Sequence, residues 1–231
     1  MSPHRKVAGF LLRGQNSRMT CILQKWQHKF AQAETSVIQP DGCRDLILVE
    51  RPNRAPVWTL SALQLGPVTA HVAKNIRLTG FRLSPGSQVP KGLLQELPHA
   101  LHLAEAEIRR SVICNARNDE MIMAISTAQT VGAAAKHCGV SARSLQRAMV
   151  RETGRAPAFW QRLARARRAA VRVDQPLADV AADCGFSDQA HMSREFRHWF
   201  GVSPRALRRL TQMKAQFAQP ALATGEQIST K

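Results

Sequence analysis

Residues 130–149 read T-V-G-A-A-A-K-H-C-G-V-S-A-R-S-L-Q-R-A-M, and residues 176–196 read P-L-A-D-V-A-A-D-C-G-F-S-D-Q-A-H-M-S-R-E-F. Both stretches follow one pattern, about 46 positions apart. In each, small apolar residues at i, i+3, i+4 and i+7 predict one buried face of a helix. These residues are Val131, Ala134, Ala135 and Cys138 in the first copy and Leu177, Val180, Ala181 and Cys184 in the second.

A turn and a second helix follow at the same positions in both copies. Gly139 and Gly185 end the first helix, because glycine adopts the left-handed conformation that a sharp turn needs. Ser141 and Ser187 then stand where an N-cap residue begins the second helix. A helix, a short turn and a capped helix form a helix-turn-helix unit, whose second helix enters the major groove of DNA. The sequence therefore predicts two such units in tandem.

Composition favours the same partner. The chain of 231 residues has 33 Lys+Arg against 16 Asp+Glu, a formal net charge of +17. A charge of this size fits nucleic acid, an anionic membrane or simply a soluble basic protein. Its distribution narrows the choice, because between residues 139 and 210 every Lys or Arg position is arginine. The guanidinium group suits bidentate contact with phosphate and guanine, although a GC-rich genome would also favour arginine codons. The longest early apolar run, residues 7–12, is too short for a membrane span or a signal peptide.

The remaining C-terminal sequence predicts helices. Gly154 ends the first recognition helix, and Pro157 begins a long helix expected over residues 158–173. Its packing stripe is Phe159, Leu163, Ala166 and Ala170. A shorter helix is expected near residues 120–128, ahead of the first unit, and residues 213–231 show no periodicity and are expected to be a disordered tail.

Residues 1–115 lean toward β-structure. Strands are predicted over residues 46–49, 57–60, 68–72 and 76–83, with turns at residues 39–43 and 84–86. An amphipathic helix follows around residues 101–112, and residues 115–119 are the expected joint between domains. The fold class is therefore α+β, a small β-rich N-terminal domain (1–115) before an all-α domain (116–212) of two helix-turn-helix units joined by a long helix. Five widely spaced cysteines suggest reduced thiols in a cytoplasmic protein.

The repeat resembles the DNA-binding region of the AraC-type (AraC/XylS) transcription regulators. The segment G-F-S-D-Q-A-H-M-S-R-E-F-R-H-W-F-G-V-S-P at residues 185–204 is similar to that family's most recognisable stretch. In the first unit, the family's spacings are met by Ser141, Leu145, Arg147, Gly154 and Pro157. Met149 and Met192 depart from the usual Phe and aromatic or Leu, but both are apolar. The resemblance covers residues 118–211.

The first half resembles, more loosely, a short sensing domain of some of these regulators. P-D-G-C-R-D-L at residues 40–46 and G-F-R-L-S-P-G at residues 80–86 carry this likeness. Such domains are related to cupin-like β-barrels, but the H-x-H and glutamate metal ligands of cupins are absent. We expect neither a metal nor another cofactor. The resemblance leaves open a small-molecule effector, a homodimer and RNA polymerase as partners beside double-stranded DNA.

The predicted DNA contacts follow from helical geometry, at about 100° per residue. In the first recognition helix, Arg143, Gln146 and Arg147 lie opposite the buried Leu145 and Met149, and the resemblance points to the same three side chains as base contacts. In the second recognition helix, the candidate base contacts are Gln189, His191 and Arg194. His191 has a capping or packing role as the alternative, and Arg194 has a phosphate or intramolecular contact as the alternative. The expected phosphate contacts are Arg151, Arg162, Arg165, Arg197, Arg205 and Arg208.

The leading hypothesis is a sequence-specific transcription regulator with no catalytic residues, whose N-terminal domain senses a small molecule or mediates self-association. The alternative is a DNA-repair alkyl-transfer protein, because some of these carry the same tandem behind a zinc-bound cysteine domain. That chemistry needs clustered thiolates. Cys21 and Cys43 are the only cysteines before residue 114, which makes the alternative the weaker hypothesis.

Overall fold

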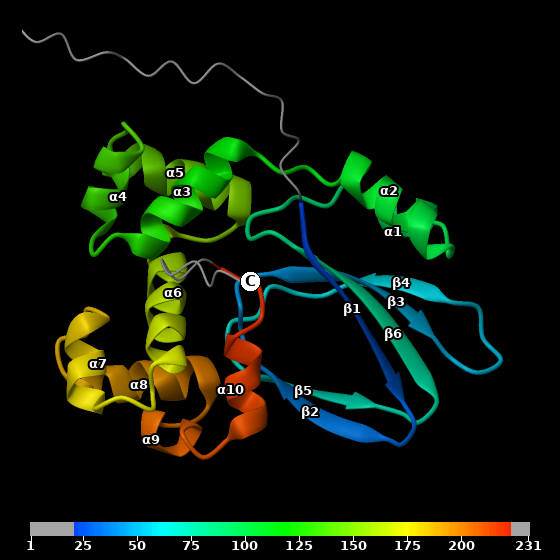
Figure 1. The fold of residues 1–231 in the computed structure, drawn as a ribbon. Helices are drawn as coiled ribbons and strands as arrows, with labels where there is room; N and C mark the ends of the chain where they lie inside the picture. Colours follow the sequence, from blue (N-terminus) through cyan, green and yellow to red (C-terminus); the bar gives the residue numbers. More distant parts are fainter. Residues whose placement is uncertain (1–20, 223–231) are drawn as a thin grey trace, which may run out of the picture.

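The computed structural model describes residues 21–222, in which a β-region packs beside a helical region (Figure 1). The six strands are β1 (Ile22–Phe30), β2 (Glu34–Ile38), β3 (Arg44–Glu50), β4 (Val57–Leu60), β5 (Val68–Val72) and β6 (Ile76–Leu83). Four of them form an antiparallel sheet in the order β1-β6-β3-β4, while β2 and β5 form a separate two-stranded ribbon. All four predicted strands are present, and β1 and β2 are additional.

The sheet has its own hydrophobic core. Leu46 and Leu48 of β3 alternate inward and are fully buried, as period-2 patterning requires. They meet the short helix α1 (Leu93–Glu96) and the longer helix α2 (Leu101–Ser111), whose Ala104 and Ile108 are buried in the same cluster. Helix α2 therefore covers the sheet with its apolar face, as its amphipathic pattern predicts.

The close approach of Trp26 explains why residue 80 is glycine. Gly80 lies in the G-F-R-L-S-P-G motif, the second of the two motifs that resemble sensing domains. A Cβ atom at Gly80 would lie 2.0 Å from the indole ring of Trp26 on the neighbouring strand. Only glycine leaves room for that ring. The indole nitrogen in turn donates a hydrogen bond of 2.8 Å to Asp45, which ties β1 to the start of β3.

Eight helices form the second half of the described chain. They are α3 (Ala116–Thr127), α4 (Val131–His137), α5 (Ala142–Thr153), α6 (Pro157–Val171), α7 (Leu177–Asp183), α8 (Gln189–Phe200), α9 (Pro204–Leu207) and α10 (Thr211–Phe217). Helices α4–α5 and α7–α8 are the two helix-turn-helix units, at opposite ends of α6 (Figure 1). The structure thus has the predicted α+β class, a β-rich region followed by two units on a long helix.

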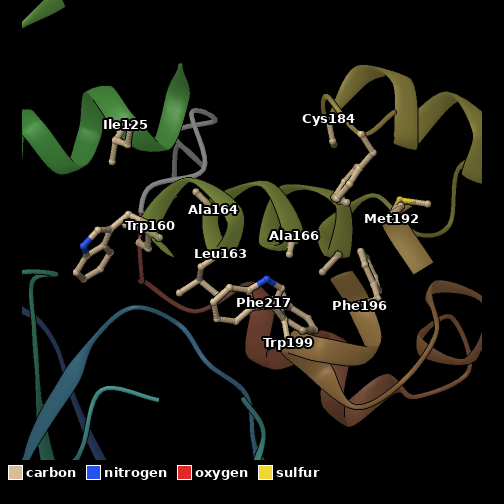
Figure 2. Packing of buried hydrophobic residues seen from close by; sticks show 14 of the residues in the cluster. Ile125, Trp160, Leu163, Ala164, Ala166, Cys184, Met192, Phe196, Trp199 and Phe217 are labelled. Carbon is tan, nitrogen blue, oxygen red and sulfur yellow. The ribbon is translucent and has the colours of Figure 1, made fainter. Parts of the chain in front are cut away.

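The linker helix α6 organises the helical core. Leu163, Ala166 and Ala170 of the predicted stripe are buried, and Trp160 and Ala164 join them (Figure 2). Small alanines let neighbouring helices approach closely, while the large rings of α8 fill the space that remains. Both units therefore share one core through α6.

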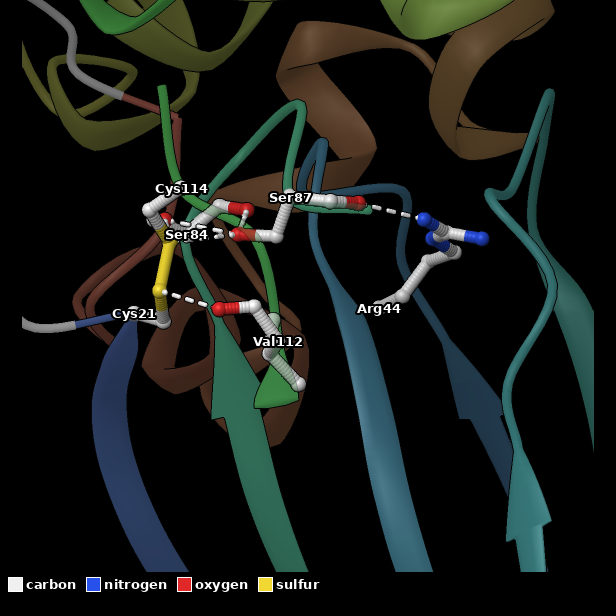
Figure 3. The surroundings of a disulfide bond; sticks show 6 residues. All are labelled: Cys21, Arg44, Ser84, Ser87, Val112 and Cys114. Carbon is white, nitrogen blue, oxygen red and sulfur yellow. Dashed lines mark hydrogen bonds between the residues drawn. A yellow bond between two sulfur atoms is a disulfide. The ribbon is translucent and has the colours of Figure 1, made fainter. Parts of the chain in front are cut away.

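Two expectations are wrong within the described residues. Residues 213–217, expected in a disordered tail, belong to helix α10, and Phe217 and Leu222 are buried against the helical core. The cysteines were expected to be reduced, but Cys21 and Cys114 are joined by a disulfide that links the start of β1 to the segment between α2 and α3 (Figure 3). The two lie 93 positions apart, and the fold brings their Cα atoms to 5.7 Å. Residues 7–12 and 223–231 lie outside the described residues.

Candidate DNA-binding surface

The turn of the first unit sets the direction of helix α5. Gly139 adopts a φ of +64°, and the hydroxyl of Ser141 accepts a hydrogen bond of 3.1 Å from the backbone N–H of Ser144. Leu145 and Met149 are fully buried beneath the helix, so its opposite face is turned outward. At its far end, Gly154 closes the helix with a φ of +70°. These features follow the predicted pattern.

Helix α5 exposes three polar side chains that have no hydrogen-bond or ion-pair partner within the described protein. Arg143, Gln146 and Arg147 are all exposed. Within residues 21–222, none of the three has a hydrogen-bond or ion-pair partner. An arginine–glutamine–arginine surface on a capped recognition helix has the donors and acceptors needed for base edges in a major groove.

Helix α8 begins differently from its counterpart. Ser187 was the expected N-cap, but Asp188 takes that place and its carboxylate accepts a hydrogen bond from the backbone N–H of His191. Hydrogen bonds from its own helix lower the pKa of Asp188, so it stays ionised at the positive end of the helix dipole. An aspartate caps at least as well as a serine, which is why the one-residue shift is tolerated.

The ring of His191 is held at the beginning of α8. Its Nδ1 lies 3.1 Å from the hydroxyl of Ser187, and the ring packs edge-on against Phe186 with centroids 5.4 Å apart. Of the two roles that sequence left open, the geometry favours capping and packing. Gln189, Arg194 and Arg197 are exposed on the same helix, and within the described chain their side chains have no hydrogen-bond partner.

Arg162 has an intramolecular role that the sequence did not predict. Its guanidinium binds both carboxylate oxygens of Glu195 on α8, at 3.1 and 2.8 Å. The indole nitrogen of Trp199 donates to the same carboxylate at 3.1 Å. Burial alone would raise the pKa of Glu195, but these donors lower it below its ordinary value. The pair fixes the second recognition helix to the linker helix.

The other predicted phosphate contacts divide into engaged and open side chains. Arg165 donates to the carbonyl of Gly185 and lies over the ring of Phe186, and Arg208 donates to the carbonyls of Val173 and Gln175. These arginines hold loops of the second unit in place. Within residues 21–222, Arg151 pairs only with its neighbour Glu152, and Arg205 is exposed and has no partner.

A buried polar seam joins the β-region to the helical region, and no sequence pattern indicated it. Arg167, which is 2% exposed, donates from α6 to the carbonyl of Pro40 at 3.3 Å. Arg82 forms an ion pair of 3.0 Å with Asp41 and also bonds Gln219 and the carbonyl of Pro220. Burial raises the pKa of Asp41, against the opposing pull of Arg82. The two N-terminal motifs that resemble sensing domains, residues 40–46 and 80–86, therefore both lie at this buried polar seam.

The two units, their outward arginines and their shared linker helix define a tandem helix-turn-helix architecture, a class of fold that many DNA-binding proteins use. A family model described as a helix-turn-helix domain matches residues 134–210. The match covers nearly all of both helix-turn-helix units and the linker helix between them. No helix within residues 21–222 is both long and apolar enough to cross a membrane.

Curated relatives match part of the chain. The HTH-type transcriptional regulator ArgR of Pseudomonas aeruginosa is 35% identical over 74 residues, 31% of this chain and 22% of its own length. The HTH-type transcriptional activator RhaS of Escherichia coli strain SE11 is 37% identical over 79 residues, 33% of this chain and 28% of its own. The chain therefore spans less than a third of the relatives that it matches.

Two solved structures are also similar. An AraC-type transcriptional regulator from Chromobacterium violaceum is 26% identical with a TM-score of 0.35, covering 46% of this chain and 95% of that one. ToxT from Vibrio cholerae is 11% identical with a TM-score of 0.39, covering 80% of this chain and 97% of that one. The alkyl-transfer alternative is not favoured, because the named relatives are transcription regulators.

Proposed function

We propose that the chain is a sequence-specific, DNA-binding transcription regulator in which helix α5 is the principal reader of bases. The N-terminal domain senses a small molecule or mediates self-association. The observation that carries the proposal is that Arg143, Gln146 and Arg147 are exposed. Within the described protein, their side chains form no hydrogen bond or ion pair. The named relatives support the same class of function.

The chemistry of these side chains suits base recognition. Arginine pairs with the O6 and N7 atoms of guanine, and glutamine pairs with the N6 and N7 atoms of adenine. Each well-formed pair gives about 1–3 kcal/mol of discrimination against the wrong base. Three such side chains on one helix therefore suffice to specify a short box of sequence.

Helices α8 and α9 contribute mainly contacts to the DNA phosphates in this proposal. Arg194, Arg197 and Arg205 are exposed and point to phosphate binding, which positions a protein on DNA without reading its sequence. Arg151 at the end of α5 adds a further positive charge beside the first groove. The net charge of +17 favours a strong, salt-dependent attraction.

One chain engages two successive major grooves in this arrangement. Helix α6 holds both units in a single core, and grooves on one face of DNA recur about every 34 Å. The preferred site should then contain two unequal boxes about 10 base pairs apart, with no palindrome inside one chain's footprint. The box under α5 should be the more strongly specified.

Selection of bound fragments from a random DNA pool, with the full chain, tests this proposal. We expect an enriched motif with the two-box form. Gln146→Ala should relax the preference at one adenine-containing position, because it removes the partner of that base. Gln27→Ala, at an exposed position on β1, is the matched control and should return the unaltered motif.

Two results would count against the proposal. A pool that shows uniform enrichment, with no preferred sequence, would indicate a general DNA-coating protein. A palindrome in which each half contacts one unit per chain would contradict the two-groove arrangement while leaving sequence recognition intact.

A further inference from the structure

The disulfide between Cys21 and Cys114 lies where the chain passes from the β-region to the helical region (Figure 3). Cys21 immediately precedes β1, and Cys114 lies between α2, which covers the sheet, and α3, which leads into the first helix-turn-helix unit. The bond therefore ties the first strand to the joint between the two regions.

A disulfide is unusual in a protein of the proposed function. Such a protein works beside genomic DNA, in a compartment whose glutathione and thioredoxin keep thiols reduced. Disulfides that occur there are usually transient and are often redox-sensing. A bond that opens and closes under those conditions needs an accessible sulfur atom with a second cysteine beside it.

The two cysteines differ in their access to solvent. Cys21 is 6% exposed, whereas Cys114 is partly exposed. Thiol–disulfide exchange proceeds by attack of a thiolate on a sulfur atom that it can reach. Cys114 is therefore the cysteine that exchanges with a small thiol, and Cys21 is the resolving cysteine.

Polar groups of the protein surround both sulfur atoms (Figure 3). The hydroxyls of Ser84 and Ser87 each lie 3.4 Å from the Sγ atom of Cys114, and a hydroxyl at this position can donate to a thiolate. The Sγ atom of Cys21 lies 3.4 Å from the carbonyl oxygen of Val112, which can accept from the thiol that reduction creates. Both sulfur atoms therefore have hydrogen-bond partners when the bond is open.

The free cysteines of the described chain are in less reactive surroundings. Cys43, Cys138 and Cys184 form no disulfide within residues 21–222. Burial raises the pKa of all three thiols, so each stays protonated at neutral pH. Because the thiolate is the nucleophile, these cysteines are poor partners for exchange.

The disulfide brackets the turn that follows β6. The carbonyl oxygen of Cys21 accepts a hydrogen bond of 2.8 Å from the backbone N–H of Ser84. On the other side, Ile113 and Gln88 exchange two backbone hydrogen bonds of 3.0 Å. Residues 84–88 therefore lie between the two segments that the disulfide joins.

The same turn contacts the end of the first recognition helix. The side-chain amide of Gln88 donates to the carboxylate of Glu152 at 3.0 Å and to its backbone carbonyl at 3.3 Å. The hydrogen bond from Arg151 lowers the pKa of Glu152, so this acceptor stays ionised at neutral pH. A disulfide acts mainly by limiting the open conformations of the chain. Opening it should therefore loosen Ile113, Gln88 and the end of α5.

We propose that Cys21 and Cys114 form a reversible redox site. Glutathione disulfide (GSSG), or a similar low-molecular-weight disulfide, closes the bond, and the corresponding thiol (GSH) opens it. The closed state restrains residues 84–88 and the end of α5, and the open state releases them. The reducing compartment and any effect on DNA binding rest on the proposed function, whereas the exchange chemistry is tested without it.

Glutathione alone balances the reaction. A glutathione thiolate attacks the Sγ atom of Cys114, the bond between the two protein sulfurs breaks, and Cys21 leaves as a thiolate that takes up a proton. A second glutathione thiolate attacks the glutathione sulfur of the mixed disulfide, which releases GSSG and leaves Cys114 to take up a proton. Two electrons pass from two glutathione molecules to the protein, and the reverse sequence closes the bond.

Equilibration of the full chain with glutathione tests the site. The buffers run from GSSG alone to about a 100-fold excess of GSH over GSSG at about 5 mM GSH. Acid quenching, labelling of free thiols with maleimide and peptide mapping then measure the bond. We expect it to be closed in most chains at the oxidising end and open in most chains at the reducing end.

Two single variants test the separate roles of the cysteines. With GSSG, Cys21→Ala should hold a glutathione adduct at Cys114, because the resolving thiol is absent. Cys114→Ala should form less adduct at Cys21, because that residue is buried. Cys138→Ala is the matched control, since it removes a partly exposed cysteine that forms no disulfide, and it should titrate as the wild type does.

Three results would overturn the redox site. A bond that stays closed at the reducing end would be purely structural. A bond that does not form in GSSG alone would be absent in solution. An adduct that forms more readily at Cys21 than at Cys114 would contradict the assigned roles.

Hydrogen exchange measures the restraint in the oxidised and reduced wild-type chains. The amides of Gln88 and Ile113 should exchange at least about threefold faster after reduction, whereas the amide of Phe196, in the middle of α8, should be unaffected. Unchanged exchange at Gln88 and Ile113 would show that the bond does not restrain the turn. Faster exchange at Phe196 as well would show that reduction unfolds the chain, and this too would overturn the proposal.

The effect on DNA binding is measured on the motif that fragment selection recovers. Oxidised and reduced wild-type chains should differ at least about fivefold in affinity, and Cys114→Ala should be insensitive to glutathione. Equal affinities would overturn the effect on DNA binding and retain the redox site. A chain that passes the glutathione test but has no preferred DNA sequence would show that the proposed function, and not the redox site, is wrong.

Discussion

The two helix-turn-helix units share one sequence pattern but use their polar residues in opposite ways. Helix α5 has Arg143, Gln146 and Arg147 exposed and unpartnered in the described chain. Helix α8 uses His191 to pack its own beginning and Glu195 to bind Arg162 of the linker helix. The same scaffold therefore yields one helix that is available to a ligand and one that is anchored to the protein. Two helix-turn-helix units with the same sequence pattern therefore need not contribute equally to DNA recognition.

The largest effect on stability should come from removing the Arg162–Glu195 pair, which fixes helix α8 to the linker helix. Arg162→Ala leaves the carboxylate of Glu195, whose side chain is 10% exposed, without its bidentate partner. Removing one member of a fully buried pair costs about 3–5 kcal/mol, but Arg162 is 44% exposed and solvent reduces that cost. We expect a loss of about 2 kcal/mol in the free energy of unfolding, measured by denaturant titration.

The pH dependence of this pair has a definite sign. Because the pKa of Glu195 is lowered on folding, the stabilisation is complete above its ordinary value of 4.5 and is lost as the pH falls through the lowered value. Wild type and Arg162→Ala should therefore converge in acid. Arg197→Ala, an exposed arginine on the same helix, is the control and should change stability by less than about 0.5 kcal/mol. If the two variants behave alike, α8 is not anchored through Arg162.

The next effect concerns the DNA affinity of helix α5. Arg147→Ala should cost about 1–3 kcal/mol of affinity on the selected DNA site and relax specificity at one position. Its free energy of unfolding should not change, because the side chain is exposed and forms no hydrogen bond or ion pair within the described protein. Binding titrations on selected and scrambled DNA measure both quantities. Equal losses on the two DNAs would mean that Arg147 contacts phosphate and that α5 is not the reader.

The two units should also respond to pH in opposite directions. Burial raises the pKa of Asp119, in the first turn of α3 beside the first unit, to about 6. A raised carboxyl pKa stabilises the protein in acid, and that contribution is lost as the pH rises from 3.8 through about 6. Asp119→Asn should therefore stabilise the protein at pH 8 by about 1 kcal/mol, the full shift being reduced by partial exposure, and change little at pH 4.

Thermal or denaturant unfolding at the two pH values checks this expectation. Asp179→Asn is the matched control, because Asp179 is exposed in the first turn of α7 in the second unit. Removing it should give no gain at pH 8, since an exposed acid at a helix N-terminus is favourable. A similar gain in both variants would show that overall charge, rather than the burial of Asp119, governs the response.

The sequence predicted the helical region well for a physical reason. Short-range periodicity, glycine stops and N-caps are local, so the pattern around Val131 or Leu177 determines its own helix. The misplaced cap at Ser187 is a one-residue error between two good capping residues. Helix α10 was missed because its burial depends on Phe217 reaching a core built elsewhere.

Non-local features could not be predicted in the same way. Strand β1 contains lysine, histidine and glutamine in place of an alternating apolar pattern, and only its pairing with β6 makes it a strand. The contact of Arg167 with Pro40 joins residues 127 positions apart, and neither residue carries a local sign of it.

The smallest effect is the most direct test of the comparison, because Arg194 occupies the place in α8 that Arg147 occupies in α5. Both side chains are exposed, yet α8 is held by the Arg162–Glu195 pair and its neighbour His191 is turned to packing. We expect Arg194→Ala to cost less than about 1 kcal/mol, equally on selected and scrambled DNA, and to lower the salt slope by about one unit, as for one lost phosphate contact. The same titrations that serve Arg147→Ala measure it, over a salt series. A loss confined to the selected site would show that α8 reads bases as well, and the distinction between an available and an anchored helix would then fail.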